Sequence, residues 1–138
     1  MFGKGADKDK RIEMLARLDR FRDLSDDEIH RVVEEATYLT VPEGWALMVE
    51  RTPADKAYLI LDGEVSVRRD GEEVARVSAG ELIGEMALVN RKLRNATVVA
   101  ETQLEVLHFT DETVKRLNDQ IPQFQQALAG ASQERSAD

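Results

Sequence analysis

This sequence of 138 residues contains no cysteine, so no disulfide can stabilise the folded chain. It also has no run of 18 apolar residues and no charged-then-apolar leader at its N-terminus. These absences argue against a disulfide-stapled secreted scaffold and against a membrane-spanning chain. We therefore expect a soluble cytoplasmic protein with a single hydrophobic core, which a chain of this length can bury without staples.

Basic charge is also scarce. The sequence has 19 Lys and Arg residues against 27 Asp and Glu, which gives a formal net charge of −8 and a pI near 4.9. A general affinity for nucleic acid or for anionic lipid requires a basic field, so we expect neither DNA nor a membrane as a partner. Any anionic ligand must be held by a local basic pocket.

The usual motifs of catalytic and metal sites are missing as well. The two histidines, His30 and His108, are far apart and have no paired-ligand spacing, so we expect no metal site. No serine lies in a motif that would activate a nucleophile, and no Gly-rich loop of the nucleotide-hydrolysing type is present. We expect no catalytic residues and a protein that is not an enzyme. A cupin-like jelly-roll enzyme would need a histidine-rich metal motif, which this sequence lacks, so we do not expect an enzyme of that class.

The pattern of apolar residues predicts helices at both ends of the chain. From Arg11 onward apolar residues recur three positions apart, which predicts a short helix. Ser25 and Glu28 match the capping box that begins a second helix. Near the other end, Asp111 and Pro122 can each lead a helix.

The middle of the chain contains about eight short runs typical of β-strands. They are separated by turn residues, among them Asp62-Gly63 and Asp70-Gly71, and both pairs are hairpin signals. Such spacing is typical of a compact antiparallel barrel or sandwich. We predict one mainly β domain with flanking helices over residues 11–130, between flexible ends at residues 1–10 and 131–138.

The stretch Gly80–Thr97 combines glycines, an acid and several basic residues in an otherwise apolar run. Residues Glu85–Val89 can form one helical turn directly after Gly84, and such a turn offers free backbone N–H groups to an anion. Glu85 begins that turn, and Arg94 follows after a short basic connection. A carboxylate and a guanidinium suit a ligand with a hydroxyl and an anion close together, and a ribose phosphate has both.

The segment Gly84-Glu85-Met86-Ala87-Leu88, followed by Arg94-Asn95-Ala96-Thr97, resembles the phosphate-binding cassette of the cyclic nucleotide-binding domain family. That family includes the catabolite activator proteins and the regulatory subunits of protein kinase A. The resemblance extends over Phe21–Leu128 and includes Val41-Pro42-Glu43-Gly44 and the segment Tyr58–Val65. It implies an antiparallel jelly-roll β-barrel with flanking helices, in which the cassette lies between the sixth and seventh strands.

Carried over position by position, the resemblance implies that Glu85 accepts a hydrogen bond from the ribose 2′-OH. It also implies that Arg94 pairs with the cyclic phosphate. The remaining positions of the implied ligand site are the backbone amides of Gly84, Met86, Ala87 and Asn95, the apolar walls Leu82 and Ile83 on the sugar side, and Ala96.

The resemblance further implies a regulatory module that senses a cyclic purine nucleotide, cAMP in the first place or cGMP, with no other cofactor. Its C-terminal helices would signal to an effector protein that the sequence does not identify. Too few residues follow Leu128 for a helix-turn-helix domain, so we expect no DNA binding, and a weak homodimer is compatible with the sequence. The alternative is a jelly-roll domain that binds no nucleotide and acts as a protein-interaction or scaffold module, with Glu85 and Arg94 as a plain ion pair.

Three segments depart from the family pattern. The family commonly has Glu-Gly-Asp where this chain has Glu50-Arg51-Thr52, so a turn glycine is missing and we expect that loop to be built differently. The connection Asn90–Leu93 lacks a common proline and has two extra cations. Asn95 stands where Ala, Ser or Thr is usual, and its side-chain amide could reach a purine edge.

Overall fold

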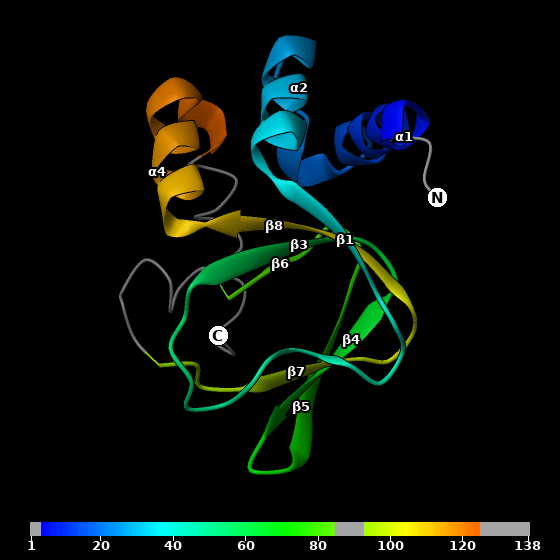
Figure 1. Ribbon diagram of the computed structural model, residues 1–138, viewed down its shortest axis with the longest axis vertical. Coiled ribbons are helices and arrows are strands. Elements are labelled where there is room, and N and C mark those ends of the chain that lie inside the picture. Colours follow the sequence, from blue (N-terminus) through cyan, green and yellow to red (C-terminus); the bar gives the residue numbers. More distant parts are fainter. Residues whose placement is uncertain (1–3, 85–92, 125–138) are drawn as a thin grey trace.

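The computed structural model describes residues 4–84 and 93–124, in which helices flank two β-sheets (Figure 1). The helices are α1 (Lys4–Ala16), the 3-10 turn η1 (Asp19–Phe21), α2 (Asp26–Glu35) and α4 (Asp111–Gln120). The strands are β1 (Thr37–Val41), β2 (Ala46–Met48), β3 (Lys56–Asp62), β4 (Glu64–Arg69), β5 (Glu72–Ser78), β6 (Leu82–Ile83), β7 (Thr97–Ala100) and β8 (Leu104–Thr110). The predicted turn Glu85–Val89 lies outside the described residues.

The strands form two four-stranded antiparallel sheets. One has the order β1-β8-β3-β6 and the other has the order β2-β7-β4-β5. Apart from β4 and β5, neighbouring strands are therefore distant in the sequence, as in a jelly roll. The prediction of a mainly β jelly roll with flanking helices is confirmed, although the described strands form two separate sheets rather than one closed barrel.

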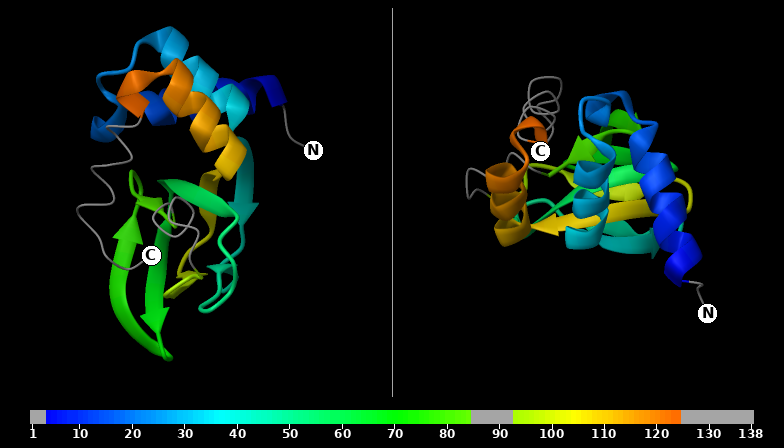
Figure 2. Two further views of the ribbon diagram at one scale, coloured as in Figure 1. Left: turned by 90° about the vertical axis from the view of Figure 1, so that its left-hand side faces the viewer. Right: turned by 90° about the horizontal axis from the view of Figure 1, so that it is seen from above.

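The sheet β1-β8-β3-β6 is apolar on both faces. Because side chains alternate along a strand, Leu59 and Phe109 pack beneath the helices, whereas Ile60 and Val106 pack against the other sheet. Figure 1 and Figure 2 show α1, α2 and α4 over one face of this sheet and the strands of the second sheet beyond its other face. The single core expected from the chain length is therefore divided into two, one on each side of this sheet.

Helix α2 begins at the predicted capping box. The Glu28 backbone N–H donates to Ser25 Oγ (3.2 Å), and the Ser25 N–H donates to the Glu28 carboxylate (2.8 Å). The box thus satisfies a backbone N–H that the first helical turn leaves without an intrahelical partner. Ile29, Val32 and Val33 are buried on the inner face of the helix. Among the described residues, no helix is both long enough and apolar enough to cross a membrane.

The N-terminal apolar stripe does not form one continuous helix. The spacing predicted a helix from Arg11 onward, but α1 begins earlier and ends at Ala16, and the chain then continues into η1. Leu15 and Phe21 are nonetheless both fully buried in the core beneath the helices. A spacing of three residues fits a 3-10 turn as well as an α-helix, so the pattern could not locate the break.

Only one of the two Asp-Gly pairs makes a hairpin. Asp70-Gly71 joins β4 to β5 with left-handed backbone at both residues (φ 52° and 84°), as a type I′ turn requires. Asp62-Gly63 instead leads the chain from one sheet to the other, because β3 and β4 belong to different sheets. The hairpin prediction there was wrong, since an Asp-Gly pair indicates a tight turn but not which strands will pair.

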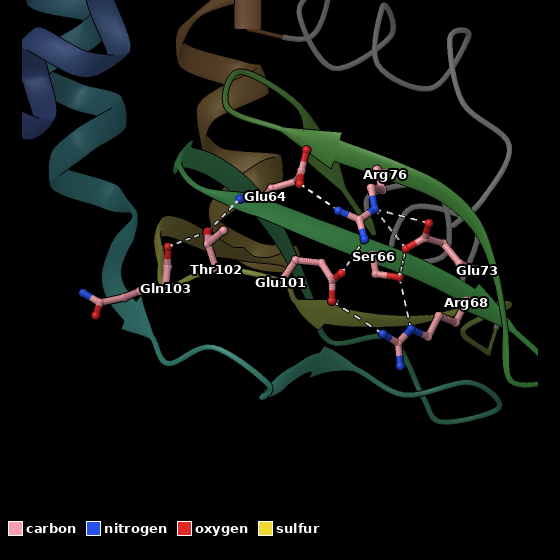
Figure 3. A network of polar contacts seen from close by, with 8 residues as sticks. All are labelled: Glu64, Ser66, Arg68, Glu73, Arg76, Glu101, Thr102 and Gln103. Atoms are coloured by element: carbon pink, nitrogen blue, oxygen red, sulfur yellow. Dashed lines mark hydrogen bonds and ion pairs between the residues drawn. The ribbon is translucent and has the colours of Figure 1, made fainter.

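The outer face of the sheet β2-β7-β4-β5 has a network of ion pairs (Figure 3). The Arg76 guanidinium lies 3.2 Å from Glu73, 3.1 Å from Glu64 and 2.7 Å from Glu101. The hydroxyl of buried Ser66 donates to the Glu73 carboxylate (2.6 Å), and this bond, assisted by Arg76, lowers the pKa of Glu73. Exposed ion pairs each stabilise a fold by only about 0–1 kcal/mol, so the two cores stabilise the sheets more than this network does.

Gly63 lies in the connection that leads from one sheet to the other, and substituting it tests how closely this connection is packed. Its φ is 104°, and a Cβ there would lie 2.6 Å from the Gln103 carbonyl oxygen, whereas at Gly71 (φ 84°) a Cβ would meet nothing within 4 Å. Gly71→Ala should therefore cost about 1–2 kcal/mol from backbone strain alone. Gly63→Ala adds a clash with backbone and should cost about 3 kcal/mol or more. Urea unfolding of both variants measures the difference, and equal losses would contradict the close packing at Gly63.

Candidate functional site

The described part of the candidate site lies where β6 ends and where the chain approaches β7. Ile83 packs in the core between the sheets, whereas its neighbour Leu82 packs in the core beneath the helices. The structure therefore places these two predicted wall residues on opposite faces of their strand. Ala96 is buried between the sheets, and Asn95 is exposed. The predicted site residues Glu85, Met86 and Ala87 lie outside the described residues.

Arg94 is a buried cation, with only 4% of its surface exposed. Its Nη1 donates to the Gly84 carbonyl oxygen at 2.7 Å, and its Nη2 donates to the carbonyl oxygen of Lys56. The guanidinium thus connects its own segment to the end of β6 and to the start of β3. Removing a charge from water costs several kcal/mol unless hydrogen bonds compensate, so these carbonyl groups help to hold a positive charge in an apolar region.

Gly84 allows the guanidinium to approach the backbone this closely. A Cβ at this position would lie 2.5 Å from Arg94 Nη1 and 2.8 Å from Met48 Cε. Its φ of 84° also falls in the left-handed region that favours glycine. The left-handed backbone therefore favours glycine at position 84, and a Cβ there would also displace the ends of the Arg94 and Met48 side chains.

The loop Glu50-Arg51-Thr52 holds the backbone of Arg94 from the other side. The Arg51 N–H donates to the Arg94 carbonyl (2.8 Å), and the Arg94 N–H donates to the Thr52 carbonyl (2.8 Å). Arg51 has a left-handed backbone (φ 66°), and its guanidinium pairs with Asp70 at 2.9 Å. Arg51 thus has the left-handed backbone that glycine adopts most readily, although a side chain is present.

Tyr58, whose hydroxyl feels the charge of Arg94, and its cross-strand neighbour His108 were not among the predicted site residues. Tyr58 on β3 is half-buried, and burial raises the pKa of its hydroxyl while the positive charge of Arg94 opposes this rise. His108 on β8 pairs with Tyr58 in the register, and their ring centroids lie 6.1 Å apart.

Burial, assisted by the charge of Lys56, lowers the pKa of His108. From the sequence, His108 was weighed only as a metal ligand. The described residues contain no group of three or more side chains that could hold a metal ion. The alternation along β8 could have revealed its position, because His108 falls on the same face as Val106.

Comparison with known proteins assigns this chain to a family. The model of the cyclic nucleotide-binding domain matches residues 38–120. The chain is similar to the cAMP-dependent protein kinase regulatory subunit of Yarrowia lipolytica, with 35% identity over 97 residues, covering 69% of this chain and 26% of that protein. It is also similar to the cGMP-dependent 3′,5′-cGMP phosphodiesterase A of Dictyostelium discoideum, with 31% identity over 101 residues, covering 73% of this chain and 12% of that protein.

A solved structure agrees with these relatives. The catabolite activator protein of Thermus thermophilus superposes with a TM-score of 0.76 at 26% identity, covering 84% of this chain and 57% of that one. The chain spans about a quarter of the length of the yeast kinase subunit and a smaller share of the phosphodiesterase.

A substitution at Gly84 tests the close approach of Arg94. Gly80 has a similar backbone (φ 96°), but the nearest atom to a Cβ there is Leu18 Cδ2 at 3.5 Å. Both Gly84→Ala and Gly80→Ala should therefore lose about 1–2 kcal/mol from strain. Only Gly84→Ala should shift the NMR resonance of the Arg94 Nε–H, because its clash falls on the movable end of that side chain. An unchanged Arg94 resonance in Gly84→Ala would contradict the contact.

Proposed function

This chain belongs to the cyclic nucleotide-binding domain family, and we propose that it senses cAMP in preference to cGMP and signals by moving its C-terminal helices. The observation that most supports ligand binding is the buried guanidinium of Arg94, held by backbone carbonyls beside Gly84. Preference for cAMP is supported by the kinase regulatory subunit at 35% identity, although the phosphodiesterase at 31% identity is named for cGMP.

In the proposed complex, Arg94 pairs with the cyclic phosphate and Glu85 accepts a hydrogen bond from the ribose 2′-OH. The backbone amides of Gly84, Met86, Ala87 and Asn95 complete the anion site. Ile83 contributes an apolar wall from the core between the sheets. Leu82 belongs to the other core, so its part is to anchor the strand that leads to the site.

The proposed signal has a physical route through Leu82. This residue lies in the same buried cluster as Ile121 and Phe124, which follow α4. A displacement of β6 on ligand binding would therefore disturb the packing of the C-terminal segment. Helix α4 is in turn attached to α2, because Arg116 pairs with Glu35 and Arg31 donates to Gln120 at 3.0 Å.

Arg94→Ala tests the ligand site. Removing one partner of a desolvated charge pair typically costs about 2–5 kcal/mol, so cAMP affinity should fall roughly 30-fold to several thousand-fold. Calorimetric titration with cAMP, cGMP and 5′-AMP measures affinity and specificity together. The matched control is Arg22→Ala, at an exposed arginine beside α2, which should leave the affinity unchanged.

Two outcomes of this titration separate the proposal from its alternative. If wild-type protein is folded but binds none of the three nucleotides, the chain is better described as a protein-interaction or scaffold module. If it binds cAMP and Arg94→Ala binds equally well while folded, a ligand site exists but Arg94 does not form it.

Hydrogen exchange tests the output of the domain. A ligand can shift the position of the helices only by as much as it binds one position better than the other. We expect saturating cAMP to slow amide exchange in residues 113–124 as well as in the segment around Arg94. Protection confined to the segment around Arg94 would mean that the signal leaves by another surface.

A further inference from the structure

The inner face of the sheet β1-β8-β3-β6 has a row of side chains that ends beside Arg94. The strand register places Thr37 opposite His108, His108 opposite Tyr58, and Tyr58 opposite Ile83. Residues directly opposite each other on neighbouring antiparallel strands share one face of the sheet. Because Tyr58 and Ile83 pack toward the other sheet, His108 and Thr37 face the same way.

Two cations adjoin this row. Ile83 is followed by Gly84, whose carbonyl accepts from Arg94, so the guanidinium lies at one end of the row. Lys56 precedes Tyr58 by two residues on β3, which puts its side chain on the same face, and its carbonyl also accepts from Arg94. The charges of both cations act on the row, since Arg94 acts on the pKa of Tyr58 and Lys56 acts on that of His108.

His108 is the titratable member of the row near neutral pH. Its side chain is half-buried, and its Nδ1 atom is shielded from solvent and has no hydrogen-bond partner among the described residues. A buried polar atom without a partner is unfavourable, so a ligand that enters this region can gain a hydrogen bond there.

The charged groups around His108 lie mainly on β3. Burial and the charge of Lys56 lower the pKa of His108, and Asp55 opposes them. On β1 its register partner is the uncharged Thr37. The acid on β8 itself, Glu105, points to the helix face, where it accepts a hydrogen bond from Tyr38 at 2.7 Å. Helix α4 packs against that same helix face through Val114 and Leu117, and its first-turn Asp111 pairs with Lys115 at 3.3 Å.

We propose that His108 and Tyr58 form a second wall of the ligand site, and that His108 takes up a proton when an anionic nucleotide binds at Arg94. This inference rests on the function proposed above. The phosphate of the ligand would offset the positive potential of Lys56, and this favours the imidazolium form of His108. Because such coupling is reciprocal, protonated His108 strengthens nucleotide binding by the same factor.

The sign of the pH dependence follows from this coupling. The pKa of His108 lies below its ordinary value in the free protein and rises on binding. The added affinity is therefore fully present below the pKa of the free protein and is lost as the pH rises through the pKa of the complex. The phosphodiester of a cyclic nucleotide has no second ionisation, so the ligand itself does not exchange this proton.

Calorimetry in buffers of different ionisation enthalpy counts the protons exchanged. We expect wild-type protein to take up protons when it binds cAMP at about pH 6.5. We also expect it to bind cAMP about three- to tenfold more tightly at about pH 5.5 than at about pH 7.5. His108→Gln should lose both effects. His30→Gln is the matched control, because His30 is the other histidine of the sequence and is exposed on α2, and it should keep both effects.

Binding without proton uptake in wild-type protein, or uptake that persists in His108→Gln, would overturn the inference and leave the proposed function standing. An absence of cAMP binding at every pH would overturn the proposed function and this inference with it. If His108→Gln does not fold, an NMR titration of the histidines in wild-type protein tests the inference instead. The pKa of His108 should rise on addition of cAMP, and an unchanged pKa of His108 would contradict the proposal.

Discussion

A buried positive charge needs polar partners, and Arg94 obtains some of them from the backbone. Its guanidinium donates to the carbonyls of Gly84 and Lys56, and its own backbone is paired with the loop around Arg51. Breaking such an arrangement by removing one partner typically costs about 3–5 kcal/mol, which is a large share of the stability of a small domain. The end of β6 and the start of β3 are therefore hydrogen-bonded to the same guanidinium that, in the proposed function, would bind the ligand.

The sheet β1-β8-β3-β6 lies between the two cores and contributes side chains to both. The clearest example is β6, a strand of two residues, because Leu82 faces the helices and Ile83 faces the other sheet. Any movement of this strand changes both cores at once, since close-packed interiors do not deform smoothly. In the function proposed above, the ligand would therefore meet one core while the helices rest on the other.

Local chemistry explains which elements were predictable. The capping box of Ser25 and Glu28 and the type I′ turn at Asp70-Gly71 depend on neighbouring residues, and the sequence pattern predicted both. Asp62-Gly63 looked the same locally, but strand pairing is decided by contacts between residues far apart in the sequence. The position of His108 beside Tyr58 likewise depends on register, which a single sequence does not display. The opposite placement of Leu82 and Ile83, by contrast, follows from the alternation of side chains along any strand. The cassette residues Glu85, Met86 and Ala87 are known here from the sequence alone.

The left-handed arginine at position 51 shows how a turn can dispense with glycine. Strain at such a residue costs the folded state about 1 kcal/mol or more. An arginine also has fewer conformations than a glycine in the unfolded chain, which offsets about 0.4–1 kcal/mol. Its guanidinium pairs with Asp70 at 2.9 Å, a contact that a glycine could not make. The turn therefore exchanges the ease with which glycine adopts this backbone for a side-chain link between the loop and the β4–β5 hairpin.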